Sequence, residues 1–174
     1  MYQQLKSIKL SYSQHLIETP DFYGVPNLVG LILESCTSLS KVHPSIGALH
    51  KLVFLNLEGC KNLKSFLGSI FMESLEILTL SWCSKLKKFL EVQGHMKDLS
   101  ELSLKGTAIK GLPLSIEYLT RLVLLNLRNC QNLESLSSCI YKLRCLEILI
   151  LSDCLKLKEL PEVLENMGSL LELS

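Results

Sequence analysis

The sequence predicts an α/β fold, a solenoid of leucine-rich repeats with a curved parallel β-sheet on the concave face and short 3₁₀ or helical turns on the convex face. First, 41 of the 174 residues are leucine, against five Phe and one Trp. Second, the motif L-x-x-L-x-L-x-x-C-x-x-L returns every 23 or 24 residues, within the range of about 20–29 residues for such repeats. Third, the x-L-x-L segment alternates as a β-strand does, because successive strand side chains point to opposite faces.

The repeats account for the whole chain. Their copies begin at Leu5, Leu28, Leu52, Leu75, Leu99, Leu122, Leu146 and Leu170. In the seven copies that continue past the strand, leucine fills 20 of the 21 places at the first, fourth and sixth positions. One coil cannot bury these leucines alone, so stacked coils about 4.8 Å apart must align their strands over a shared core. We predict one domain over residues 1–174, with seven repeats and the start of an eighth. Because neither end has a polar capping unit, we expect an uncapped fragment.

Five of the seven cysteines share one place in the repeat. The ninth position is filled by Cys36, Cys60, Cys83, Cys130 and Cys154, and elsewhere by Ser13 and Thr107. All are small residues that can donate a hydrogen bond, which a tight buried turn needs for its backbone carbonyls. We therefore predict packed, reduced thiols. A disulfide ladder or a metal site is the alternative, although no C-x-x-C pair favours zinc. Cys139 and Cys145 lie outside this column and match no ligand spacing.

The second half of each repeat predicts a turn on the convex side. Its clearest form is I-K-G-L-P-L-S-I-E-Y-L-T-R-L at residues 109–122. Because Pro113 can neither continue a strand nor lie inside a helix, only a short 3₁₀ segment or one α-helical turn fits there. The fifth repeat is one residue shorter, with Thr107-Ala108-Ile109 in place of C-x-x-L. We interpret this as a tightened turn within one solenoid and not as a domain boundary.

Composition and motifs argue against several functions. The chain has 18 Lys+Arg against 17 Asp+Glu, so it lacks the basic excess of a nucleic-acid-binding protein. No apolar run approaches the roughly 18 residues that span a bilayer, and no G-x-x-x-x-G-K-[ST] phosphate loop is present. The histidines show no repeated geometry to a Ser, a Cys or a carboxylate; they are His15, His43, His50 and His95. We therefore expect no catalytic residue, cofactor or metal, and neither a nucleic acid nor a membrane as partner.

The outward positions of the predicted strands are the candidate binding residues. The third, fifth, seventh and eighth positions of each repeat lie on the concave face, where a rigid sheet presents them without a packing role. Trp82 and Phe54 stand out, because aromatic side chains anchor protein interfaces. The residues predicted to contact a partner protein are Tyr12, Glu34, Phe54, Asn56, Glu58, Ile77, Trp82, Lys105, Arg128, Asn129 and Asp153.

The seventh position changes charge along the solenoid. On successive strands it holds Glu34, Glu58, Ser81, Lys105 and Arg128. Glu58 and Lys105 are two strands apart, about 10 Å, which is close to the Debye length in physiological salt. Each half can therefore keep its own potential, with Trp82 between the two. The alternative is that these charges are merely solvated and that their order is accidental.

Strings longer than the bare repeat resemble one family. They lie at residues 20–22, 26–28, 33–39 (L-E-S-C-T-S-L), 42–47, 55–63 (L-N-L-E-G-C-K-N-L) and 106–109. They resemble the repeat region of plant intracellular immune receptors of the TIR, nucleotide-binding, leucine-rich-repeat class. The resemblance implies a region that helps to hold the receptor inactive and recognises pathogen effectors or guarded host proteins. Nucleotide binding and NAD cleavage belong to the family's other domains. The family's convex proline is replaced by Leu67, Leu90 and Ser137, and Trp82 stands where Gly is common.

The predicted function is therefore protein recognition within a plant innate immune receptor, in the cytoplasm or also in the nucleus. The partner is a pathogen effector, a guarded host protein or the receptor's own nucleotide-binding domain. Two alternatives remain: the repeats of an F-box type ubiquitin-ligase adaptor and the ectodomain of a receptor-like kinase. An ectodomain normally carries N-x-[ST] sites, which none of the seven Asn forms, and a cysteine column suits a reducing compartment. An upstream F-box or TIR segment would separate the adaptor from the receptor.

Overall fold

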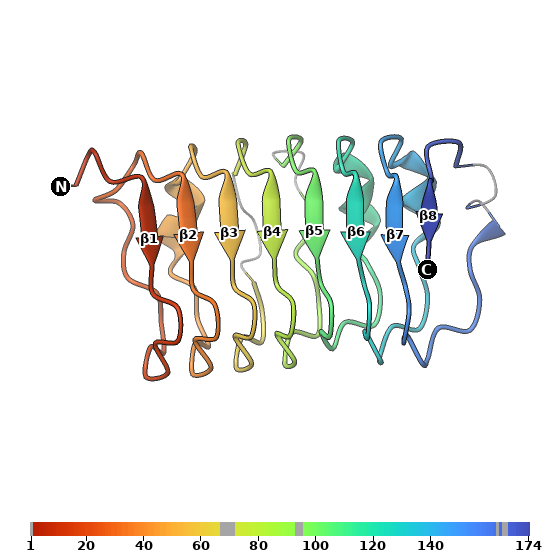
Figure 1. Cartoon of the computed structure of the whole chain (residues 1–174), viewed down its shortest axis with the longest axis horizontal. Coiled ribbons are helices and arrows are strands. Elements are labelled where there is room, and N and C mark those ends of the chain that lie inside the picture. Colours follow the sequence, from red (N-terminus) through yellow and green to blue (C-terminus); the bar gives the residue numbers. More distant parts are fainter. Residues whose placement is uncertain (1, 67–71, 93–95, 163, 165–166) are drawn as a thin grey trace.

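The structure, a computed structural model, describes residues 2–66, 72–92, 96–162, 164 and 167–174. Within these residues a short strand starts at the third position of every repeat, as the motif predicts. The strands are β1 (Ser7–Lys9), β2 (Gly30–Ile32), β3 (Phe54–Asn56), β4 (Ile77–Thr79), β5 (Glu101–Ser103), β6 (Leu124–Asn126), β7 (Ile148–Ile150) and β8 (Glu172–Leu173). They stand side by side in one row from the N-terminal to the C-terminal end (Figure 1).

The strands form one parallel sheet in which equivalent positions stack on one another. The strand order is β1 to β8 without a crossover. Leu55 of β3 pairs with Leu31 of β2 and with Leu78 of β4. The shorter fifth repeat keeps this register, because Leu102 pairs with Leu125. The sheet therefore continues through the shorter repeat without a break.

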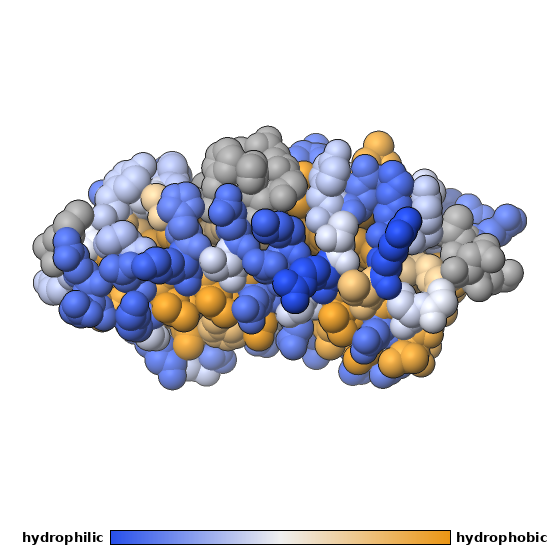
Figure 2. Space-filling view, turned by 90° about the horizontal axis from the view of Figure 1, so that it is seen from above, coloured by the Kyte–Doolittle hydropathy of each residue, from blue (hydrophilic) through white to orange (hydrophobic). Residues whose placement is uncertain are grey.

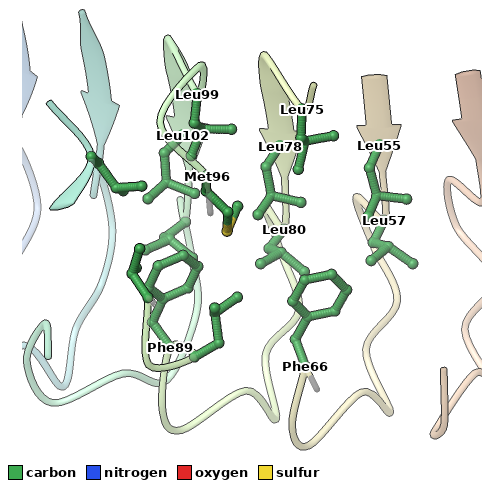
Figure 3. Packing of buried hydrophobic residues seen from close by; sticks show 14 of the residues in the cluster. Leu55, Leu57, Phe66, Leu75, Leu78, Leu80, Phe89, Met96, Leu99 and Leu102 are labelled. Carbon is green, nitrogen blue, oxygen red and sulfur yellow. The ribbon is translucent and has the colours of Figure 1, made fainter. Parts of the chain in front are cut away.

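The core is the stack of inward leucines, and it depends on having a coil on each side. The leucines of neighbouring strands point into the same interior as Phe66 and Phe89, which belong to the returning arms (Figure 3). Leu52, at the first position of an inner coil, is 0% exposed, whereas Leu5 at the same position of the first coil is 36% exposed. Leu173, in the last strand, is 46% exposed. An inner coil is thus buried by its two neighbours.

Each strand ends in a turn whose eighth position has a left-handed backbone. φ lies between 56° and 72° at Tyr12, Ser35, Gly59, Trp82, Gly106, Asn129 and Asp153. The carbonyl of Leu33, at the sixth position, accepts a hydrogen bond from the N–H of Cys36 at the ninth, at 3.3 Å. The left-handed residue is therefore the third of four, as in a type II turn. Its own N–H donates to the next coil, for example from Trp82 to the carbonyl of Lys105, so the turn also takes part in stacking.

The cysteine column satisfies carbonyls of neighbouring coils. The thiol of Cys60 donates to the carbonyl of Leu33 at 3.2 Å, and that of Cys83 donates to the carbonyl of Leu57 at 3.2 Å. Each acceptor is the sixth residue of the preceding coil, which confirms the predicted role of this position. All seven cysteines are free, and burial raises the pKa of Cys60 to about 12.

The prediction that the whole column is buried was wrong at one position. Cys154 keeps the hydrogen bond of the column, with its thiol donating to the carbonyl of Leu127 at 3.1 Å. It is nevertheless only half-buried, because the coil that follows it ends at Ser174 and covers little of it. The other four cysteines of the column, each covered by a complete coil, are 0% exposed.

The convex side carries the short 3₁₀ helices that the sequence predicts. They are η1 (Pro44–Ala48), η2 (Leu114–Tyr118) and η3 (Ser138–Lys142). The serine of the L-S-I or P-S-I string ties each arm to the preceding coil: the hydroxyl of Ser45 accepts the N–H of Phe22, and that of Ser115 accepts the N–H of Val92.

Two of the three replacements of the convex proline have a structural role. Ser137 caps η3, because its hydroxyl accepts the N–H of Cys139 at 3.2 Å. Leu90 is 4% exposed and belongs to the core. Leu67 lies outside the described residues.

The register of the strands can be tested with one neighbouring pair. Leu127 is fully buried and Arg128 is exposed. We expect Leu127→Ala to lower the free energy of unfolding by about 2–5 kcal/mol and Arg128→Ala to change it by no more than about 0.5 kcal/mol. Urea denaturation followed by circular dichroism measures both. Equal losses would contradict the register, since a slip of one residue exchanges the two faces.

Thiol reactivity tests the cysteine column. At mildly alkaline pH we expect an aromatic disulfide reagent to modify the exposed Cys145 rapidly and the half-buried Cys139 and Cys154 slowly. The four buried thiols should resist, because burial raises their pKa and only the thiolate is reactive. All seven should react in denaturant. Cys145→Ser should remove the rapid phase, and mass spectrometry that found disulfides along the column would refute this interpretation.

Candidate protein-binding face

The predicted contact residues lie on one face of the sheet and on the turns that follow its strands. Phe54 and Asn56 flank the buried Leu55 in β3, and Ile77 precedes the buried Leu78 in β4. Because strand side chains alternate, these residues point away from the core. The seventh and eighth residues extend this surface beyond the strand ends. We call the surface made by the third, fifth, seventh and eighth positions the concave face.

Two apolar groups of residues lie on the concave face. Phe54 pairs with Gly30 on one side and Ile77 on the other, and both Phe54 and Ile77 are half-buried. Leu124 of β6 pairs with Ile148 of β7, which are also half-buried. Glu101 of β5 stands between the two groups. Seen from above, hydrophobic residues gather at two places along the side of the strands, with hydrophilic residues between them (Figure 2). The expectation that these positions have no packing role was therefore too simple, because neighbouring strands cover part of each.

Trp82 sits at the centre of the concave face on the turn after β4. Its indole lies over Gly106 of the next coil, because a Cβ added to Gly106 would lie 2.3 Å from Trp82 Cε3. The ammonium of Lys105 is 5.2 Å from the centroid of the indole ring, within the range of a cation–π contact. Trp82 remains 39% exposed. A large aromatic ring is thus held in place by its neighbours while one side of it faces solvent.

The seventh positions in the N-terminal half of the concave face are acidic, whereas Lys9 at the fifth position of β1 is a cation. The hydroxyl of Tyr12 donates to the Oε1 atom of Glu34 at 3.3 Å. The negative charge of Glu34 raises the pKa of Tyr12, and the charge of Glu58 adds to this effect. Both carboxylates are half-buried. Tyr12, Glu34 and Glu58 are therefore brought together on successive coils.

The C-terminal half is less basic than its seventh positions alone suggest. Arg128 Nε lies 3.3 Å from the Oδ2 atom of Asp153 on the next coil. Both side chains are more than half exposed, so the ion pair adds at most about 1 kcal/mol to stability, but it offsets the charge of Arg128. Lys105, over the indole ring, is left as the cation of this half without a carboxylate partner among the described residues.

Two asparagines at the fifth position shape the turns next to the strands. The Oδ1 atom of Asn56 accepts the N–H of Glu58 at 2.8 Å, and that of Asn126 accepts the N–H of Arg128 at 3.0 Å. These are Asx turns, in which the side chain bonds to the backbone two residues on. Asn129 adopts the left-handed conformation and accepts a hydrogen bond from Gln131. Asn56 and Asn129 thus have structural roles beside the predicted contact role.

Ser81 departs from the expected exposure of the seventh position. It is 5% exposed, and its hydroxyl lies 2.7 Å from that of Ser103. The small side chain of Ser81, hydrogen-bonded to Ser103 of β5, is buried between the coils. The longer side chains of Glu58 and Lys105 reach solvent. The seventh-position row is therefore interrupted next to Trp82.

Sequence reasoning missed an open hollow on the side where the chain enters the strands. It has a volume of about 610 Å³ and is lined by Glu76, Asp98, Ser100, Arg121, Val123, Arg144, Cys145, Glu147 and Ser169. Arg121 NH1 pairs with the Oδ1 atom of Asp98 at 3.0 Å. Apart from Arg144, the lining residues come from the position before the motif and from its second position, so the charged residues at those places, Glu76, Asp98, Arg121 and Glu147, were the available signal.

The described residues contain no group of three or more His, Cys, Asp and Glu side chains arranged to hold a metal ion. His43 caps η1, where its Nδ1 atom accepts the N–H of Ser45 at 3.2 Å. His15 and His50 are exposed, and His95 lies outside the described residues. In the part of the chain that the structure describes, no helix is long and apolar enough to cross a bilayer.

The sequence profile described as "Disease resistance protein RPS4B-like, leucine-rich repeats" matches residues 71–159, which is more than half of the chain. The chain belongs to this family of disease resistance repeats. It is 41% identical over 167 residues to the TMV resistance protein N of Nicotiana glutinosa, and 44% identical over 166 residues to the disease resistance protein RPS4B of Arabidopsis thaliana. Each match covers 95% of this chain and 14% of the relative. The plant disease resistance repeats expected from the sequence are thereby confirmed.

Solved structures give the same fold. The leucine-rich-repeat domain of the type III effector XopL matches with a TM-score of 0.57 at 19% identity, covering 93% of this chain and 73% of that one. At this identity the likeness concerns the solenoid alone. The disease resistance repeats described here therefore share this solenoid fold, and their function lies in the residues placed on it.

The packing of Trp82 against Gly106 can be tested directly. Gly106→Ala places a Cβ where the indole lies and forces a side chain onto a backbone with φ of 66°. We expect the indole to be displaced and the free energy of unfolding to fall by about 1–3 kcal/mol. Because Trp82 is the single tryptophan of the chain, its emission and its quenching by acrylamide report the displacement. Gly24→Ala is the control, since nothing lies within 4 Å of its added Cβ. Unchanged quenching in Gly106→Ala would contradict the contact.

Proposed function

We propose that the chain is the protein-recognition region of a plant intracellular immune receptor and that it binds its partner on the concave face. The partner is a pathogen effector, a guarded host protein or the receptor's own nucleotide-binding domain. The chain spans 14% of the length of the relatives it matches, so nucleotide binding and signalling belong to other parts of such a receptor. The region itself catalyses nothing and works in the cytoplasm, or also in the nucleus.

The observation that carries this proposal is the conformation of Trp82. Gly59 and Gly106 occupy the same turn position on the neighbouring coils, and glycine adopts positive φ without strain. A tryptophan there pays about 1–2 kcal/mol for the left-handed backbone. Exposed tryptophans are frequent anchors of protein interfaces. Because the left-handed backbone belongs to the turn of every coil, Tyr12 and Ser35 included, it is the immobilised and 39% exposed indole that favours a role in binding.

The charges on either side of Trp82 favour a partner held in one orientation. At the seventh position, Glu34 and Glu58 lie on the coils before it and Lys105 lies on the coil after it. Neighbouring coils are about 4.8 Å apart, so these charges lie within about one or two Debye lengths of one another. A partner with the opposite order of charges would be steered into one register. The two apolar groups, around Phe54 and around Leu124, offer desolvated contacts on each side.

A charge reversal tests the concave face in a receptor that carries these repeats. We expect Glu34→Lys with Glu58→Lys to change autoactivity or the response to an effector in leaf tissue at unchanged protein level, because the acidic half is reversed. Glu159→Lys with Glu162→Lys is the matched control, since it makes the same charge change at exposed residues of the returning arm of the last complete repeat. A normal response of the Glu34 and Glu58 variant would mean that this half of the face is not used.

Trp82→Gly separates binding from stability in the same assays. The substitution removes the backbone strain but also the contact with Gly106, and we expect these opposing effects to leave the free energy of unfolding within about 1 kcal/mol of the original value. We expect partner response or interdomain binding to fall nonetheless. A large loss of stability with normal binding would make Trp82 a structural residue, and the proposal for this position would fail.

A further inference from the structure

Six lysines gather along the side of the solenoid where the chain leaves the strands of the third, fourth and fifth repeats. They lie in residues 59–66, 83–90 and 107–112, which contain no Asp or Glu. Over the whole chain, basic and acidic residues nearly balance, at 18 against 17. We call this group the basic edge. It consists of Lys61, Lys64, Lys85, Lys87, Lys88 and Lys110.

The fold forces these lysines outward. In the returning arms of the third, fourth and fifth repeats an inward leucine or isoleucine is followed by two outward residues and then by another inward apolar residue. Leu86 and Phe89 are buried in the fourth repeat, and Lys87 and Lys88 between them are exposed. Leu63 and Phe66 bracket the exposed Lys64 in the same way. All six lysines of the basic edge are exposed.

Three of the six stack on successive coils. Lys64, Lys87 and Lys110 follow the inward residues Leu63, Leu86 and Ile109, which occupy equivalent places. Coils repeat at about 4.8 Å, which is less than the Debye length of about 8 Å in physiological salt. Like charges stacked on neighbouring strands are destabilising, so the row contributes nothing to folding that neutral side chains could not.

Most of the basic edge has no carboxylate partner in the described part of the chain. Lys85 donates to the Oδ1 atom of Asn62 at 2.6 Å, and Lys110 lies 3.3 Å from the Oε1 atom of Glu134. Glu134 continues the row of Lys64, Lys87 and Lys110 on the sixth coil, since its N–H bonds to the carbonyl of Lys110. The one carboxylate in this row is thus bound by the lysine next to it. Among the described residues, Lys64 and Lys87 have no such neighbour.

We propose that the basic edge is a second interaction surface, separate from the concave face, which binds an acidic polypeptide segment of another protein. Carboxylates of the segment would form ion pairs with Lys64, Lys87 and Lys88, as the carboxylate of Glu134 does with Lys110. The residue types favour this partner over a nucleic acid, because the edge has neither arginine nor exposed aromatic rings, on which phosphate and base recognition commonly depend. They also disfavour a lipid surface, because Phe66 and Phe89 are buried and offer nothing to insert.

The test uses the whole chain and a fluorescent peptide of alternating Glu and Ser residues. We expect fluorescence anisotropy to show binding that weakens with salt and that a peptide with Gln in place of Glu lacks. Lys64→Glu, Lys87→Glu and Lys88→Glu combined should weaken binding at least about tenfold, because attraction becomes repulsion. The matched control reverses Lys6, Lys51 and Lys97, which are exposed on the side where the chain enters the strands. It should change affinity by less than about twofold, since these charges lie farther than a Debye length from the edge.

A neutral variant keeps the test valid if the charge-reversed protein does not fold. Lys64→Gln, Lys87→Gln and Lys88→Gln combined should also weaken binding, while the melting temperature stays the same or rises because repulsion along the row is relieved. Equal affinity of the edge variants and the original chain would overturn the proposal. So would tighter binding of the original chain to vesicles of phosphatidylcholine and phosphatidylserine, or to single-stranded oligothymidine, than to the peptide. Because the concave face is intact in every edge variant, failure here leaves the proposed function untouched.

Discussion

The burial of each coil by its two neighbours is the constraint on which the rest of the molecule depends. Within the described residues a coil has a strand of only two or three residues and at most a short 3₁₀ helix, and it cannot enclose its own leucines. The contrast between Leu52 at 0% exposure and Leu5 at 36% shows how much burial a missing neighbour removes. Stability is therefore approximately a sum of terms between adjacent coils. Positions that enter the stack hold apolar residues or small hydrogen-bond donors, whereas positions outside it differ more from repeat to repeat.

The stack is maintained by more than leucine. The turn residue at the eighth position, the thiol or hydroxyl at the ninth and the serine within η1 and η2 bond to an adjacent coil or close the turn that does so. Thr107 illustrates the constraint, because its hydroxyl donates to the carbonyl of Leu104 within its own coil at 2.7 Å, and the thiol of Cys130 donates to the same carbonyl at 3.1 Å. Polar groups in the interior thus form a second column parallel to the leucines. The backbone hydrogen bonds of the sheet set the distance between coils, and this column satisfies the carbonyls that remain at the turns.

Much of the fold could be predicted from the sequence, because the motif occurs eight times and each copy indicates which strand residues point inward. Strand starts, the inward leucines, the donors at the ninth position and the short convex helices follow from periodicity and from the limits of one coil. The left-handed eighth position did not follow, although Gly59, Gly106, Asn129 and Asp153 were the signal, since these residue types tolerate positive φ. The candidate site was less predictable. The contact of Trp82 with Gly106, the pairing of Arg128 with Asp153 and the burial of Ser81 all depend on side-chain length and rotamer between coils, which a positional pattern does not encode.

The same geometry explains how two surfaces of different character can coexist on so small a frame. The concave face and the basic edge take their residues from different positions of one repeat, so a substitution on one surface changes neither the leucine stack nor the other surface. The concave face mixes both charges with half-buried apolar residues and a strained tryptophan, features that give shape and orientation. The side chains of the basic edge are long, flexible and all positively charged, and they include no aromatic ring. They would attract an acidic segment without fixing its register. A partner held on the first surface would therefore be selected by its form, whereas a segment on the second would be selected by its charge and could slide or exchange. Because like-charged lysines on adjacent coils oppose the stacking that holds the fold together, their accumulation on three successive coils is better explained by an external partner than by folding.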